Sequence, residues 1–136
     1  VIVADGFTAN GEALRALLPA AAGRAKFLVG NSVETLRCNP ELGEAEVLVF
    51  AAFAGGNPAV IPDVWRACPN LRWVHSLAAG VDTLVPVLSA IPGGTAVPLT
   101  NAKGVFSPSL AEYALCAMLH FNKQVPRLQR NRENRA

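Results

Sequence analysis

The stretch Leu71–Asp82, L-R-W-V-H-S-L-A-A-G-V-D, carries a short apolar strand that runs directly into a turn of small residues containing Gly80. The following V-D-T-L-V-P-V-L run has the pattern of a helix, so the region reads as strand, turn and helix. Such a turn can point backbone N–H groups at an anion, and the helix dipole favours a carboxylate or phosphate there. An ordinary strand-to-helix connection uses the same small residues. The turn is therefore either an anion-binding site or an ordinary connection, and other features of the sequence are needed to distinguish the two.

Short apolar runs and helical patterns alternate on both sides of this stretch. Strands are expected at 1–5, 26–29, 46–52, 72–75 and 97–101, and helices at 12–18 and at 58–68, the second one capped by Asn57. The run at 46–52 is apolar without alternation, which is typical of a parallel strand covered on both faces. The order predicts an α/β fold, a three-layer, doubly wound parallel sheet of about five strands, with ligands at the strands' carboxyl ends near a topological switch point.

A longer helix is predicted from Ser107 onward, because an N-cap signal at Ser107 is followed by Pro108 and by a second capping signal. Apolar residues cover more than half of its circumference, which is more than packing on one sheet requires. We therefore expect a second surface to cover this helix. The pattern divides the chain into a sheet domain, 1–104, and the helix, 105–136, and we expect the sequence to be a truncated product.

Composition and cysteine usage limit the class of protein. The chain has 136 residues, of which 51% are hydrophobic, and a formal net charge of +2, which fits a globular α/β domain. No apolar run approaches the roughly 18 residues that span a bilayer. Cys38, Cys68 and Cys116 form no C-x-x-C pair, and neither His75 nor His120 stands at zinc-ligand spacing from them. We expect reduced thiols, no metal site, and a soluble protein of the cytoplasm or an organelle.

Basic residues gather near the end of the sequence, where one acid, Glu133, accompanies Lys123, Arg127, Arg130, Arg132 and Arg135. Such a segment could bind nucleic acid or acidic lipid, although a solvated helix end with cations near its C-terminus is commoner. No aromatic residue lies among these arginines to stack on bases. We therefore expect neither a nucleic acid nor a membrane as partner.

Two motifs together resemble a known family. Leu71–Asp82 and the stretch Thr100–Glu112, T-N-A-K-G-V-F-S-P-S-L-A-E, are similar to the substrate-binding domain of the D-isomer-specific 2-hydroxyacid dehydrogenases. The continuation A-L-C-A-M-L-H-F-N-K-Q-V-P-R-L resembles the family's long interdomain helix. The resemblance implies a flavodoxin-like sheet, a small 2-oxo or 2-hydroxy acid as substrate, NAD or NADP as cofactor, and a homodimer for the full-length protein.

The resemblance also implies residue roles. Ala79 and Gly80 match the family's x-G-V-D turn, whose backbone N–H groups hold the substrate carboxylate. Phe53 and Phe106 are candidates for lining the substrate pocket, and a core or rim position suits Phe53 equally well. Phe106 stands where the D-lactate branch carries a tyrosine. The sequence K-G-V-F-S around it is closer to glyoxylate and hydroxypyruvate reductase-like members. Asn101 is expected to brace the loop by side-chain to backbone bonds.

Other roles are excluded or minor. Asp82 is expected to cap the following helix, and His75 to cap or pack at a strand end. The family's catalytic Arg, Glu and His belong to its Rossmann domain, so no catalytic residue is assigned here. The sequence has no G-x-G-x-x-G, so no cofactor-binding residue is assigned either, and the chain alone is predicted to be inactive.

Two further functions compete with an enzyme part. A non-catalytic interaction or assembly module derived from the same family would use the broad apolar helix after Ser107 as an interface. A phosphoacceptor receiver domain would use Asp5 after the first strand. That site also needs a carboxylate at the end of the third strand, where this chain has A-A-F-A-G-G, so the receiver function is disfavoured.

Overall fold

The computed structural model describes residues 2–3, 24–52 and 56–135, and the chain forms two compact units, Val1–Ala102 and Lys103–Ala136. Each unit is described by itself. The expected helix at 12–18 and the residues Asp5 and Phe53 lie outside the described residues.

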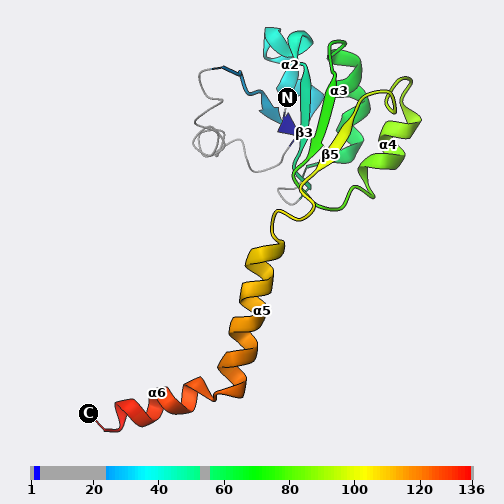
Figure 1. Ribbon diagram of the computed structural model, residues 1–136. Helices are drawn as coiled ribbons and strands as arrows, with labels where there is room; N and C mark the ends of the chain where they lie inside the picture. Colours follow the sequence, from blue (N-terminus) through cyan, green and yellow to red (C-terminus); the bar gives the residue numbers. More distant parts are fainter. Residues whose placement is uncertain (1, 4–23, 53–55, 136) are drawn as a thin grey trace. The chain divides into compact units, whose positions relative to one another are not determined.

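The first unit is a mixed α/β fold with an open, parallel sheet, as the sequence predicts (Figure 1). The strand order is β2-β1-β3-β4-β5. Strands β1 and β2 are two residues long, and the other three have three or four residues. The strands are β1 (Ile2–Val3), β2 (Val29–Gly30), β3 (Val47–Phe50), β4 (Trp73–Ser76) and β5 (Leu99–Asn101).

The helices of this unit are short. They are α2 (Val33–Arg37), the 3-10 helices η1 (Pro40–Glu44) and η3 (Pro58–Val60), α3 (Ile61–Ala67) and α4 (Leu84–Ala90). Asn57 caps the helical segment as expected, because its side chain accepts a hydrogen bond from the N–H of Ala59 at 3.0 Å. The segment begins as a 3-10 turn and becomes α-helical only at Ile61, and prolines occupy the first turn of both parts.

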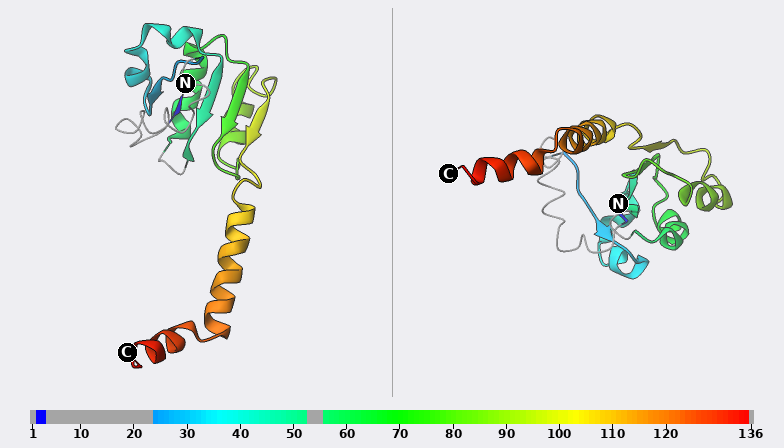
Figure 2. Two further views of the ribbon diagram at one scale, coloured as in Figure 1. Left: turned by 60° about the vertical axis from the view of Figure 1, so that its left-hand side comes forward. Right: turned by 90° about the horizontal axis from the view of Figure 1, so that it is seen from below.

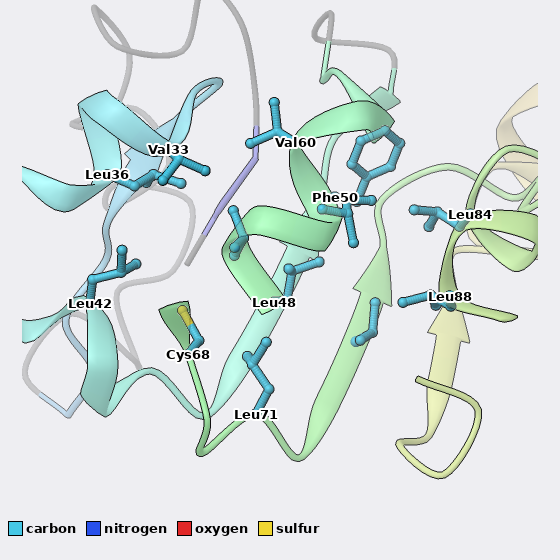
Figure 3. Close-up of a cluster of buried hydrophobic side chains, with 13 residues drawn as sticks. Val33, Leu36, Leu42, Leu48, Phe50, Val60, Cys68, Leu71, Leu84 and Leu88 are labelled. Carbon is cyan, nitrogen blue, oxygen red and sulfur yellow. The ribbon is translucent and has the colours of Figure 1, made fainter. Parts of the chain in front are cut away.

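The larger of the two apolar clusters among the described residues lies between β3, β4 and the helices, and the smaller one packs Phe27, Val29, Val49 and Leu77 against the buried Ala51. Figure 3 shows Leu48 and Phe50 of β3 among side chains of the helices such as Leu84 and Leu88. Leu48 and Phe50, together with Val74 of β4, are at most 1% exposed. Helices α2, α3 and α4 supply the other side of this cluster, and Figure 2 gives two further views of these helices and the sheet. Along β3 buried and half-buried residues alternate. Because the helix expected at 12–18 lies outside the described residues, the predicted cover on both faces and the third layer stay predictions.

The second unit contains two helices, α5 (Ser107–Asn122) and α6 (Val125–Glu133), where the sequence predicts one long helix. The chain breaks at Gln124, whose φ of 51° is left-handed. Pro126 explains the break. Inside a continuous helix it would lose a hydrogen bond and clash with the carbonyl of Asn122, whereas in the first turn of α6 its missing N–H costs nothing.

The start of α5 also differs from the prediction. Ser107 is the first helical residue, and the N-cap position belongs to Phe106, so no side chain caps the helix. Considered by itself, α5 has no buried residue. The helix thus has the apolar composition that is typical of a buried helix, but its own unit does not bury it.

Candidate functional site

The candidate site is the turn that follows β4. Its first residue, Ser76, is 1% exposed and is the single buried polar residue in the part of the chain that the structure describes. The Ser76 hydroxyl donates to the Ala78 carbonyl at 3.1 Å and accepts from the Ala78 N–H at 3.2 Å. The N–H of Leu77 donates to the Phe50 carbonyl of β3 at 3.0 Å. The start of the turn is therefore fixed both by its own hydroxyl and by the neighbouring strand.

Strand β5 holds the turn from the other side. The Asn101 side-chain amide donates to the Ala79 carbonyl at 2.7 Å, and the backbone N–H of Ala102 donates to the Ala78 carbonyl at 3.3 Å. The expected bracing role of Asn101 is confirmed, although Asn101 is the last residue of β5 rather than part of a loop. The two successive carbonyls of the turn thus have donors from the same strand end.

Ala79 and Gly80 themselves are exposed. Among the described residues, none accepts a hydrogen bond from the N–H of either one. A Cβ at Gly80 would lie 3.3 Å from a carboxylate oxygen of Asp82 and meet no backbone atom. The turn therefore presents two adjacent, unpaired backbone donors on the surface of the first unit.

Asp82 does not cap the following helix. Helix α4 begins at Leu84, its N-cap position is Thr83, and no side chain makes a cap hydrogen bond. The expected role of Asp82 is therefore wrong. Its exposed carboxylate instead lies beside Gly80, where its negative charge opposes the binding of an anion.

The strand order refines where the turn lies in the sheet. The order reverses between β1 and β3, so the topological switch point is there. The turn follows β4, one strand away from that point. It is at the carboxyl end of a parallel strand, as expected, but not directly at the switch point.

The described part of the first unit contains two of the four residues proposed to bind substrate. Ala79 and Gly80 are adjacent in the first unit, whereas Phe106 belongs to the second unit and is 56% exposed at the start of α5. Phe53 lies outside the described residues. The described site therefore consists of the Ala79–Gly80 backbone and the groups that hold it.

A second polar cluster on β4 and β5 escaped the sequence reasoning. The indole N–H of Trp73 donates to the Thr100 hydroxyl at 2.7 Å, and His75 Nδ1 lies 2.8 Å from the same oxygen. The Trp73 and His75 rings are 5.8 Å apart at 59°. His75 therefore packs within a strand pair, as expected. The available signal was the spacing of positions 73 and 75, which puts both side chains on one face of a strand.

Other site chemistries find no support in the described ranges 2–3, 24–52 and 56–135. They contain no cluster of three or more His, Cys, Asp or Glu side chains that could hold a metal ion. None of their helices combines the length and the apolar character needed to span a membrane. Perturbed pKa values occur away from the turn: a hydrogen bond to Glu41 raises the pKa of Lys26, a backbone hydrogen bond lowers that of Glu34, and burial raises that of Cys68.

Comparisons with protein-family models, with curated proteins and with solved structures found no match for this chain.

Proposed function

We propose that this chain is a substrate-binding domain of the D-2-hydroxyacid dehydrogenase family, with a flavodoxin-like sheet, and that its β4 turn holds the carboxylate of a small 2-oxo or 2-hydroxy acid. The observation that supports the proposal most strongly is the pair of exposed, unpaired N–H groups at Ala79 and Gly80. The strand order 2-1-3-4-5 supports the proposal of a flavodoxin-like sheet, in which this order is common. The motifs at Leu71–Asp82 and Thr100–Glu112 supply the family.

The chemistry of the turn suits a carboxylate. A hydrogen bond from a backbone N–H to a charged oxygen contributes about 1.5–3 kcal/mol. Two such bonds total about 3–6 kcal/mol before the cost of immobilising the ligand, so we expect a dissociation constant no lower than roughly 1 mM, which corresponds to about 4 kcal/mol. The nearby Asp82 carboxylate weakens this attraction. The turn alone therefore provides weak binding that orients one end of a substrate.

Catalysis is not assigned to residues of this chain. The sequence lacks G-x-G-x-x-G, and no residue of this chain is assigned to a nicotinamide cofactor. We propose that NAD or NADP, the catalytic Arg, Glu and His, and the homodimer contacts belong to the full-length protein. The 136-residue chain is then expected to give no turnover with glyoxylate, hydroxypyruvate or D-lactate in the presence of cofactor. Measurable turnover would contradict the proposal that substrate binding and catalysis belong to different domains.

A titration tests carboxylate binding directly. The amide resonances of a ¹⁵N-labelled chain would be followed while pyruvate is added, with methyl pyruvate as an uncharged control ligand. We expect pyruvate to shift the amides of Ala79 and Gly80 with a dissociation constant of roughly 1 mM, and methyl pyruvate to leave them unchanged. Shifts confined to other parts of the chain, or none at ten times that concentration, would exclude the proposed site.

Asp82→Asn provides an electrostatic check on the same site. Removing the carboxylate beside Gly80 removes a like charge from the neighbourhood of the bound anion. We expect the affinity for pyruvate to rise about two- to threefold, with less of a difference at high salt because exposed charges are screened. An affinity that falls in the Asp82→Asn variant at both salt concentrations would place the anion elsewhere.

A non-catalytic assembly module is the second candidate, and one observation favours it. Helix α5 has no buried residue and exposes large apolar side chains, namely Leu110, Tyr113, Leu115, Met118, Leu119 and Phe121. Exposed apolar surface of this extent is typical of a protein interface. Light scattering at several concentrations tests this function. Self-association that Leu115→Glu abolishes would support it, whereas a monomer at all concentrations whose α5 amides are protected from exchange would contradict it.

A further inference from the structure

We infer that Asn101 and Ser76 are positioning residues that aim the N–H groups of Gly80 and Ala79 at the bound carboxylate. This inference rests on the proposed function of the turn and adds the residues that set its geometry. Neither side chain has to touch the ligand. Each acts on the carbonyl of the peptide group whose N–H does.

In a planar trans peptide group, the C=O of one residue and the N–H of the next point in opposite directions. The Ala78 carbonyl accepts hydrogen bonds from the Ser76 hydroxyl at 3.1 Å and from the Ala102 N–H at 3.3 Å. Fixing this carbonyl fixes the direction of the Ala79 N–H. That N–H therefore points away from Ser76 and from the end of β5.

The next peptide group is held in the same manner. The Ala79 carbonyl accepts from the side-chain amide of Asn101 at 2.7 Å, and so the N–H of Gly80 points away from Asn101. Because Asn101 and Ala102 are consecutive residues at the end of β5, both carbonyls are held from one side. The two N–H groups consequently share the opposite side, where one carboxylate can accept from both.

Loss of the Asn101 donor would release the second peptide group. A peptide that rotates turns a donor away from the anion and brings a carbonyl oxygen toward it, which replaces attraction by repulsion. The Ala78 carbonyl has a second donor in Ala102, so loss of the Ser76 hydroxyl should have a smaller effect. The structure therefore predicts an order, with Asn101 more important for affinity than Ser76.

The experiment compares Asn101→Leu with a matched control, Asn70→Leu. The side-chain amide of Asn70 also donates to a loop carbonyl, that of Gly43, at 3.1 Å, but Asn70 precedes β4 and lies outside the turn. Leu is similar in size to Asn and has no donor. For each protein we would measure the dissociation constant for pyruvate, from the amide shifts of Ala79 and Gly80, and the midpoint of thermal unfolding.

We expect Asn101→Leu to weaken pyruvate binding about tenfold and Ser76→Ala about two- to threefold. Asn101→Gln, which keeps a side-chain amide, should recover part of the affinity. Asn70→Leu should lower the thermal midpoint to a similar degree as Asn101→Leu and change the affinity less than about twofold. The contrast between the two leucine variants separates positioning from general destabilisation.

The outcomes distinguish the two levels of the hypothesis. If the unmodified chain does not bind pyruvate at the turn, the proposed function and the positioning role both fail. If it binds and Asn101→Leu binds within twofold of it, the positioning role alone is overturned. Should the Asn101→Leu variant lose its amide dispersion, Ser76→Ala and Asn101→Gln decide, because unchanged affinity in both would contradict the inference.

Discussion

The two compact units differ in where their apolar residues lie. In the first unit Phe50 is 1% exposed within a cluster drawn from β3, β4 and the helices, whereas in the second unit Phe121 is 77% exposed on a helix with no buried residue. An isolated helix of about this length is only marginally stable in water. The first unit therefore contains its own source of stability, whereas α5 has no buried cluster of its own to stabilise it.

The sharpest test of this difference replaces one phenylalanine in each unit. Phe50→Ala removes a fully buried ring and should lower the free energy of unfolding by about 3–5 kcal/mol. Phe121→Ala removes an exposed ring and should change it by less than about 0.5 kcal/mol. Urea unfolding measures both, with fluorescence of the two tryptophans, Trp65 and Trp73, reporting on the first unit and circular dichroism on all helices.

Circular dichroism provides the control, because it detects α5 even if the two units unfold independently. A loss of more than about 1 kcal/mol in Phe121→Ala would mean that α5 is packed against another surface in solution. The contrast between the units would then reflect an interface and not an absence of packing.

Two glycines extend the comparison from side chains to backbone. A Cβ at Gly94 would lie 2.1 Å from the Leu88 carbonyl oxygen, so the end of α4 has to move to admit it. Gly104, at the start of the second unit, has φ +87° and open space around it. Gly94 is thus required by packing, and Gly104 only by its left-handed backbone.

Gly94→Ala should lower the free energy of unfolding by about 3 kcal/mol, through overpacking against backbone atoms. Gly104→Ala should cost about 1–2 kcal/mol locally and leave the tryptophan-detected midpoint unchanged. Equal effects of both substitutions on that midpoint would show that the two units unfold as one.

Local patterns explain how much of the fold was predictable. The expected strand at 72–75 is one residue from β4, because an apolar run before a small-residue turn is a local signal. Helices α2 and η1 were missed because each is five residues long, too short for a periodic pattern. The break at Gln124 had a local signal in Pro126, which the apolar pattern of α5 concealed.

The site was less predictable than the fold. The family resemblance implied that Asn101 braces a loop by side-chain to backbone bonds, and the bond from its side-chain amide to the Ala79 carbonyl confirms that role. The cluster of Trp73, His75 and Thr100 depends on the register that pairs His75 with Thr100. Register between β4 and β5 is set by how the sheet packs, and no pattern along the sequence contains it.

The smallest expected effect concerns Cys68, which is 1% exposed and has a thiol pKa raised from 9.0 by burial. The folded state keeps this thiol neutral, whereas the unfolded chain loses the proton above about pH 9. The unfolded state then binds fewer protons, so the free energy of unfolding falls as the pH rises past 9.0. This decline should be shallower in Cys68→Ala, as measured by urea unfolding between about pH 8 and pH 10.

The rates at which the three cysteines are labelled also compare the two units. Cys38 and Cys116 are exposed and Cys68 is buried, so iodoacetamide should modify the first two at least about a hundredfold faster, because Cys68 reacts only when its surroundings open. Cys38 serves as the reference within the first unit. If Cys116 on α5 reacts as slowly as Cys68 while Cys38 reacts fast, a second surface covers α5. That result would support the assembly function in addition to carboxylate binding.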